Sequence, residues 1–282
     1  MKFGAQLYTI RDYMHSHKEF ANSIKKISKL GFECVQISGV DPIVPVEEIA
    51  ETCKAYGLEI AITHTNPKRI MENTKEVILD HKLMGCNYVG IGMIPNEYER
   101  SKSGFMKFAL DFTPAARALK EEGMQLMYHN HHIEFEKYEG KLVMDFIREV
   151  FREVNFTLDT YWVQAGGADP AHWIRKLDKR VEVLHLKDFA VFEGISRMCE
   201  VMEGNLNWVR IMNAAKDVGV KYAMIEQDEC YGKDPFECLG TSLFNIRNKL
   251  SEYEFESDVP QEQFKPQYID RKLSSDKDEI IW

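Results

Sequence analysis

The chain has 282 residues, of which 44% are hydrophobic and 11% aromatic, enough for one large α/β barrel or two small domains. Its formal net charge of -9 argues against nucleic acid as the main partner, because binding a phosphate backbone requires clustered Lys and Arg. No apolar run approaches the roughly 18 residues of a membrane span, and residues 1–8 turn polar too soon for a signal peptide. We therefore expect a cytoplasmic protein without membrane association whose partner is a small, neutral or weakly charged molecule.

The first half of the chain alternates between strand and helix patterns. Strands are predicted at residues 2–8, 33–38, 59–63 and 88–92, and helices at residues 17–30, 46–56, 75–84 and 105–122. Gly31 and Gly85 directly follow two of these helices, at the place where glycine commonly ends a helix. Four strand–helix units therefore precede residue 123.

The second half repeats the same rhythm. Strands are predicted at residues 125–128, 155–158, 181–185 and 222–226, and helices at residues 142–150, 170–177, 208–218 and 235–250. Eight such units over about 250 residues are typical of a (β/α)8 TIM barrel. The alternative is an open doubly wound sheet, but no G-x-G-x-x-G motif follows the first strand. We predict the α/β class, with residues 1–250 forming a single barrel domain.

Residues 251–282 lie outside the barrel pattern and are predicted to be a C-terminal extension. They are rich in Gln, Lys, Asp and Glu, with scattered aromatic residues. We expect this extension to pack along its own barrel or against a neighbouring subunit of a homo-oligomer, and the alternative is partial disorder.

Six cysteines are spread along the chain without a C-x-x-C pair. Cys34, Cys53 and Cys86 lie inside apolar patterns that indicate strands or helices. The cysteines are therefore predicted to be reduced and mostly buried, with no disulfide framework.

Polar clusters follow four consecutive predicted strands, at residues 128–134, 158–162, 184–188 and 225–228. The carboxyl ends of parallel strands form the ligand face of α/β folds, so side chains from these clusters should converge. Asp159, His185 and Glu226 are candidate ligands of a divalent metal. Each has a simpler explanation: Asp159 could cap the next turn, His185 could be a core histidine, and Glu226 could belong to a solvated loop.

The fourth metal ligand is predicted in the segment that holds His129, His131, His132, Glu134 and Glu136. We select Glu134, because with Asp159, Glu226 and one imidazole it gives an oxygen-rich site suited to manganese, magnesium or cobalt, with manganese as the leading candidate. Several imidazoles would shift the preference toward zinc.

Further residues are predicted to face the same cavity. Lys187 lies two positions after His185 and shares its face of the strand. Expected substrate contacts are Tyr8, Arg11, His64, His129 and Trp162. Alternatively, His64 could cap the following helix, Arg11 could pair with Asp12 at the surface, and Trp162 could serve packing alone.

These segments, together with Gln6-Leu7-Tyr8-Thr9-Ile10-Arg11-Asp12, resemble the sugar phosphate isomerase/epimerase group of xylose-isomerase-like barrels. The resemblance spans residues 1–250 in the same order. It implies a divalent metal at the barrel mouth held by Glu134, Asp159, His185 and Glu226. The sugar epimerases usually place the first Glu at the end of strand five itself, where this chain has His129-Asn130-His131. In this respect the chain resembles a subgroup that includes keto-sugar lyases.

The resemblance and the residues together predict a metal-dependent isomerase or epimerase that acts on a small sugar or keto-sugar through an enediolate. Glu134 and Glu226 are expected to move protons, with His131 or His129 as an alternative base, and Lys187 to steady the negative charge. The nearest alternative is a lyase or dehydratase that eliminates water or an aglycone from a keto-sugar or keto-inositol. A phosphodiesterase and a non-catalytic sugar-binding protein are the remaining alternatives.

Overall fold

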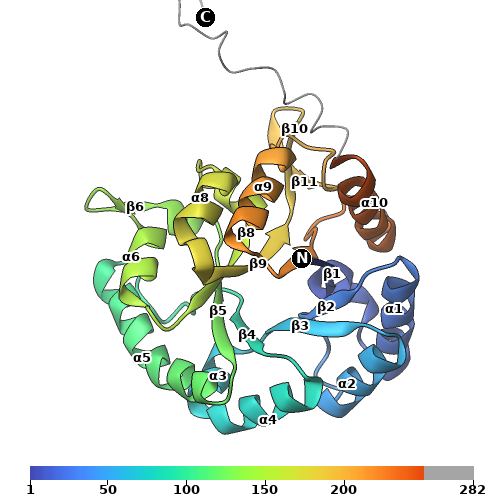
Figure 1. The fold of residues 1–282 in the computed structure, drawn as a ribbon, viewed down its shortest axis with the longest axis horizontal. Helices are drawn as coiled ribbons and strands as arrows, with labels where there is room; N and C mark the ends of the chain where they lie inside the picture. Colours follow the sequence, from blue (N-terminus) through green and yellow to red (C-terminus); the bar gives the residue numbers. More distant parts are fainter. Residues whose placement is uncertain (251–282) are drawn as a thin grey trace, which may run out of the picture.

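Eight parallel strands close into a barrel in a computed structural model that describes residues 1–250. Figure 1 shows helices surrounding these strands on the outside. The predicted α/β TIM barrel is thus confirmed. The predicted packing of residues 251–282, and any subunit contact through them, lies outside the described residues.

The barrel strands follow one another in chain order around the ring, and β1 closes it by pairing with β12. They are β1 (Lys2–Gln6), β2 (Cys34–Ile37), β3 (Glu59–His64), β4 (Tyr88–Ile91), β5 (Gln125–His129), β8 (Asn155–Asp159), β9 (Val181–Leu186) and β12 (Tyr222–Ile225). Asp159 lies opposite His185 in the register of β8 and β9. The candidate ligands therefore lie at similar heights in the barrel.

The outer helices match the predicted ones to within a few residues at each end. They are α1 (His17–Lys29), α2 (Val46–Ala55), α4 (Thr74–Met84), α5 (Lys102–Glu121), α6 (Val143–Val150), α8 (Pro170–Leu177), α9 (Trp208–Val218) and α10 (Pro235–Asn248). Gly85 and Gly219 end α4 and α9 with φ of 64° and 82°. This left-handed conformation is readily available to glycine, which explains its place at these helix ends.

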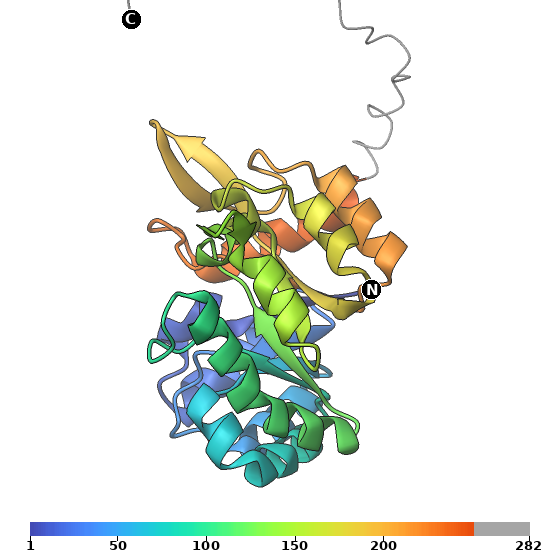
Figure 2. The ribbon, with the colours of Figure 1, turned by 90° about the vertical axis from the view of Figure 1, so that its left-hand side faces the viewer.

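Several short elements were not predicted, and all but η3 follow the carboxyl end of a barrel strand. They are the 3-10 helices η1 (Leu7–Tyr13), η2 (Ile133–Phe135) and η3 (Asp178–Arg180), the helices α3 (Pro67–Glu72) and α7 (Thr160–Ala165), and the hairpins β6–β7 (Lys137–Tyr138, Lys141–Leu142) and β10–β11 (Asp188–Phe192, Ile195–Cys199). The strand predicted at residues 2–8 ends at Gln6, because the Gln6 side chain accepts the Tyr8 N–H and starts η1. Figure 2 shows β10–β11 projecting from the barrel.

The barrel interior is filled by a small cluster that includes Cys34, Ile62, Met127, Val183 and Met224. Met224 packs so closely on Gly4 that a Cβ there would lie 2.3 Å from its Cε. The larger apolar core lies between the strands and the helices. This packing supports the strand ends that carry the candidate site.

The six cysteines are free, and Cys34, Cys53 and Cys86 are buried as predicted. Burial raises the pKa of each of these three thiols to about 12. Within residues 1–250, no helix has both the length and the apolar composition needed to cross a membrane.

Candidate metal centre

Four buried side chains meet at the carboxyl ends of consecutive barrel strands. They are His129, Asp159, His185 and Glu226, and their potential ligand atoms all lie within 4.8 Å of one another. We call these four residues the ligand group. His129 and Asp159 are the last residues of β5 and β8, His185 lies in β9, and Glu226 directly follows β12. The barrel thus gathers residues that are up to 97 positions apart, 226 minus 129, at one point.

The two imidazoles of the ligand group are oriented by partners on their outer nitrogens. His129 Nδ1 lies 2.9 Å from the carbonyl oxygen of Gly92, and His185 Nε2 lies 2.7 Å from Gln36 Oε1. Both partners accept hydrogen bonds, so each imidazole carries its proton on the outer nitrogen when neutral. The inner nitrogens, His129 Nε2 and His185 Nδ1, then point lone pairs into the group. Metal-binding histidines are commonly held in this way.

Two acceptor atoms of the ligand group face each other. His185 Nδ1 and Glu226 Oε2 are buried 2.8 Å apart, and when the His185 proton is on Nε2 each presents a lone pair to the other. Such a buried contact is unfavourable, and shared coordination of a cation would satisfy both atoms. The donor atoms of the group, two nitrogens and two carboxylate oxygens, are of the types that bind zinc and related divalent metals. The residues therefore fit a divalent metal.

A buried lysine, Lys187, lies against the same carboxylates. Its Nζ is 3.1 Å from Asp159 Oδ2, 2.9 Å from Glu226 Oε2 and 3.0 Å from Asp228 Oδ2, and the side chain is 1% exposed. When the three carboxylates are ionised and His185 is neutral, three negative charges lie against one ammonium. One divalent cation would balance the remaining two charges, which is compatible with the same assignment.

Electrostatics keep the ligand group largely charged. Burial favours the neutral form of Asp159 and Glu226, but the Lys187 ammonium and nearby imidazoles hold the pKa of both carboxyls far below the usual range. Burial alone would lower the pKa of His185, whereas the carboxylates of Glu226 and Asp159 raise it to about 9. Burial and repulsion from Glu226 raise the pKa of Asp228 to about 7. The site therefore attracts positive charge.

Glu134, the fourth ligand predicted from the sequence, is not part of the ligand group. Its Oε1 accepts the hydroxyl of Tyr128, and its Oε2 accepts the backbone N–H of His131 at 2.7 Å. The 3-10 turn η2 carries Glu134 beneath its own loop, so its carboxylate holds that loop instead of facing the other ligands. His129 completes the ligand group, because the last residue of β5 points into the barrel mouth in the same way as Asp159 at the end of β8.

Asp159 caps a helix and also faces the other residues of the ligand group. Its Oδ1 accepts the Trp162 N–H at 2.9 Å and caps α7, while its Oδ2 faces His129 and Lys187. A capping aspartate and a metal ligand are therefore compatible at this position.

Two positioning residues were missed by the sequence reasoning. Asn130 Oδ1 accepts the backbone N–H of Asp159 at 2.9 Å and ties β8 to the end of β5. The Thr160 hydroxyl approaches the Lys187 backbone, 2.8 Å from its carbonyl oxygen and 3.0 Å from its nitrogen, and so connects β8 to β9. Each is a short polar residue directly after a candidate ligand, which is the signal that could have identified it.

Replacing Thr160 with Val should lower the free energy of unfolding by about 1–3 kcal/mol, because the isosteric side chain leaves the buried Lys187 N–H without an acceptor. Denaturant unfolding of the purified variant measures this loss. Thr113→Val is the matched control, since within residues 1–250 the Thr113 hydroxyl bonds only the carbonyl oxygen of Ala109 in its own helix, α5. Equal losses in both variants would show that Thr160 does not connect the two strands.

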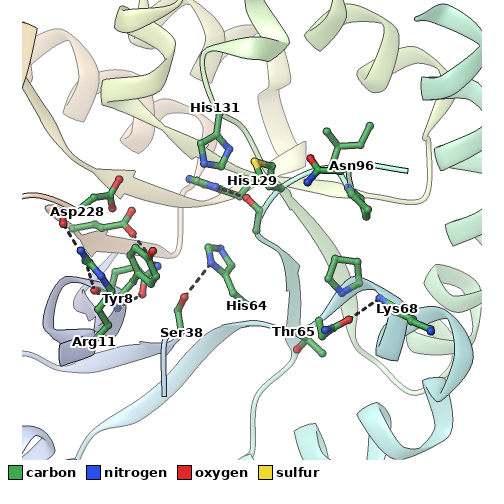
Figure 3. Close-up of a pocket in the computed structure, with 18 of the residues that line it drawn as sticks. Tyr8, Arg11, Ser38, His64, Thr65, Lys68, Asn96, His129, His131 and Asp228 are labelled. Atoms are coloured by element: carbon green, nitrogen blue, oxygen red, sulfur yellow. Dashed lines mark hydrogen bonds between the residues drawn. The ribbon is translucent and has the colours of Figure 1, made fainter. Parts of the chain in front are cut away.

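A cavity of about 830 Å³ opens above the ligand group. Figure 3 shows His64 and His131 near its centre, with Tyr8, Arg11 and Asp228 on one side. Of the predicted substrate contacts, Tyr8, Arg11, His64 and His129 line this cavity. Arg11 donates hydrogen bonds to the carbonyl oxygens of Tyr8 and Asp228 and so connects the segments that follow β1 and β12. These contacts differ from the surface ion pair with Asp12 that was the alternative.

Trp162 lies behind His131, with ring centroids 5.3 Å apart, and does not border the cavity. The ring packs against the His131 imidazole, and its predicted substrate contact stays a prediction. The alternative explanation of Trp162, packing, describes this geometry.

Two imidazoles that face the cavity each have an unpaired ring nitrogen. His131 Nδ1 and His64 Nε2 are buried atoms without a hydrogen-bond partner among the described residues. Burial, followed by the neighbouring His129, lowers the pKa of both, to about 3 for His131. The lowered pKa favours the neutral form of both rings, and it makes each a weaker base than a free imidazole.

Comparison with known families and structures agrees with the fold described above. A family model described as xylose isomerase-like TIM barrel matches residues 24–237, and no curated protein matches the sequence. A sugar phosphate isomerase/epimerase from Parabacteroides distasonis has a TM-score of 0.72 and 23% identity, covering 88% of this chain and 98% of its own. An L-ribulose 3-epimerase has a TM-score of 0.68 and 15% identity, covering 94% and 99%. A probable 3-DHS dehydratase from Bacillus anthracis has a TM-score of 0.68 and 14% identity, covering 88% and 100%. At these identities the structural likeness establishes the fold alone.

Proposed function

Because the chain belongs to the xylose isomerase-like TIM barrel family, we propose that it is a metal-dependent isomerase or epimerase of a small sugar or keto-sugar. The observation that carries this proposal is the ligand group, two imidazoles and two carboxylates buried beneath a cavity. When bound, the metal would supply Lewis-acid stabilisation of the negative charge that develops on the substrate's oxygens as an enediolate forms.

The proposed metal is a divalent cation, and the two leading candidates are zinc and manganese. Manganese was favoured for a set of mostly oxygen ligands that included Glu134. With His129 in that place, the four donors are two nitrogens and two oxygens. This balance moves the preference toward zinc. Metal analysis of the purified protein distinguishes the two.

His131 is our candidate for the residue that moves protons, with His64 as its partner across the cavity. Both imidazoles are neutral, and their unpaired nitrogens can accept a proton from a substrate carbon or hydroxyl and return it. Glu226 is held by Gln6, His185 and Lys187, so we assign it to the ligand group before any role as a base. Lys187, whose pKa is raised by the surrounding carboxylates despite burial, would steady negative charge on the substrate.

The second candidate function is a lyase or dehydratase acting on a keto-sugar or keto-inositol. The observation that favours it is the pair of unpaired imidazoles, since elimination requires both a base and an acid for the leaving group. Both reactions would use the same enediolate. They differ in the substituent on the β-carbon, which a lyase expels and an isomerase or epimerase retains. A phosphodiesterase or a non-catalytic sugar-binding protein would share the fold without proton exchange on a sugar.

Solvent-deuterium incorporation tests the proposal. Metal-loaded protein is incubated in D₂O with ketoses, aldoses and 3-keto-sugars, and the products are followed by mass spectrometry. Exchange of carbon-bound hydrogen without other mass change is the expected result. Loss of water or an aglycone would select the lyase, and absence of change in every sugar would contradict both enzymatic functions.

Replacing His131 with Gln should slow this exchange by about a hundredfold, because a positioned base contributes at least that factor to proton transfer. Metal content should stay unchanged, since His131 is not in the ligand group. His132→Gln is the matched control: the neighbouring ring also packs on Trp162 but does not line the cavity. A similar exchange rate in the His131 variant and the parent would rule out His131 as the base.

A further inference from the structure

The cavity is longer than the ligand group requires, and its far side is built by two loops. Residues 65–68 follow β3 and residues 92–97 follow β4; we call these two segments the loop wall. In Figure 3, Asn96, Thr65 and Lys68 lie on one side of His64 and His129, and Asp228, Tyr8 and Arg11 lie on the other. The ligand group therefore occupies one part of an extended cleft.

The volume of this cleft exceeds what one sugar ring needs. At about 830 Å³ it falls in the upper part of the range found for pockets that enclose drug-sized ligands. A single ring placed at Lys187 and Glu226 would leave the space along the loop wall unfilled. A substrate that fills the cleft therefore needs a second group, beyond the reacting ring, that lies along the loop wall.

The lining of the loop wall indicates the chemistry of that second part. Pro67, Met93 and Pro95 offer apolar surface, and Met93 is 44% exposed. Asn96 lies among them, and its side chain makes no hydrogen bond with residues 1–250, so its amide is free for a ligand. Apolar patches interleaved with an amide suit a sugar ring, which presents C–H faces and hydroxyl groups together.

Charge in the cleft argues against a phosphorylated substrate. The end beside Tyr8 carries Asp228 and Glu229. Of the cations there, Arg11 is already engaged by backbone carbonyls and by Glu229 at 3.6 Å, and Lys187 is already paired with Asp228 and two further carboxylates. In the loop wall, Lys68 is accompanied by Glu97 and pairs with Glu72 at 4.0 Å. Neither end gathers the cations that a phosphate group would require.

We propose that the substrate is an unphosphorylated glycoside of two rings, with the reacting ring at the ligand group and an uncharged second ring against the loop wall. This inference rests on the proposed sugar chemistry and specifies its substrate class. Recognition of the second ring is assigned to Met93 and Asn96.

Calorimetric titration of the metal-loaded protein tests this assignment. The ligands are glucose, glucose 6-phosphate and four disaccharides, maltose, cellobiose, laminaribiose and sophorose, which differ in linkage. At least one disaccharide should bind about tenfold more tightly than glucose, as expected when a second group fills a matched pocket. The double variant Met93→Ala/Asn96→Ala should remove that advantage and leave the affinity for glucose unchanged. Met106→Ala is the matched control, because Met106 on α5 is similarly exposed, at 45%, and does not line the cavity.

Several outcomes would overturn the inference: equal binding of glucose and all four disaccharides, tightest binding of glucose 6-phosphate, or an undiminished disaccharide advantage in the double variant. Deuterium exchange in a monosaccharide without a disaccharide advantage would refute the two-ring substrate and leave the proposed function standing. Disaccharide binding that depends on Met93 and Asn96, without deuterium exchange in any sugar, would support the two-ring ligand and refute the proposed function. Absence of binding by every sugar would count against both.

Discussion

Replacing Asp159 with Asn is expected to abolish stable metal binding while leaving the fold intact. Loss of a residue that hydrogen-bonds a metal ligand lowers metal affinity by about 10- to 100-fold. The variant loses a charged ligand itself, so its metal affinity should fall by more than this. The fold should persist because Asn caps a helix about as well as Asp, and α7 begins at this residue. Metal analysis after dialysis, together with circular dichroism and thermal unfolding, measures both effects.

Glu134→Gln is the matched control for this experiment. Glu134 and Asp159 are both fully buried carboxylates near the barrel mouth, but only Asp159 belongs to the ligand group. Metal content should be unchanged in Glu134→Gln, because the contacts of Glu134 are with Tyr128 and the His131 backbone. Retention of metal by Asp159→Asn, or its loss from Glu134→Gln alone, would contradict the assigned ligands.

Replacing Lys187 with Met should destabilise the metal-free protein by about 3–5 kcal/mol, the usual cost of removing one partner from a buried ion pair. The side chains are similar in length, so the lost charge dominates. Asp159, Glu226 and Asp228 would then face one another without the ammonium. A divalent cation should recover much of this loss, because it supplies positive charge to the same carboxylates. Denaturant unfolding with a chelator and with added metal measures the two values.

Lys221→Met is the control for the lysine experiment. Lys221 also pairs with a carboxylate, that of Glu182, but its side chain is 57% exposed. Exposed pairs contribute at most about 1 kcal/mol, so this variant should unfold nearly as the parent does, with or without metal. If the Lys187→Met and Lys221→Met variants have the same free energy of unfolding in the presence of the chelator, the charge balance described for the site is contradicted.

Much of the barrel could be predicted from the sequence because its strands and helices are long enough to show a period. The helix at residues 170–177 and the helix at residues 208–218 have the predicted bounds. The short elements could not be predicted in this way, since their structure depends on distant partners. The loop that returns from β11 is held by Asp188, which accepts the N–H groups of Met202 and Gly204 and the indole N–H of Trp208. None of these pairings leaves a local pattern.

The candidate site could be predicted for residues at strand ends and less well for residues in loops. Asp159, His185 and Glu226 follow apolar runs directly, so their convergence follows from the barrel. The choice between His129 and Glu134 depended on the path of the chain after β5, which the 3-10 turn η2 sets. A glutamate is the usual ligand in the resembling group, and that expectation outweighed the position of His129 at the strand end.

A crystal structure of the metal-loaded protein, with anomalous diffraction recorded at the absorption edges of manganese and zinc, tests the central claim most directly. The result we predict is one cation bound by His129, Asp159, His185 and Glu226, with Glu134 still bonded to Tyr128 and the His131 backbone. A cation bound elsewhere, or one that takes Glu134 in place of His129, would contradict the account.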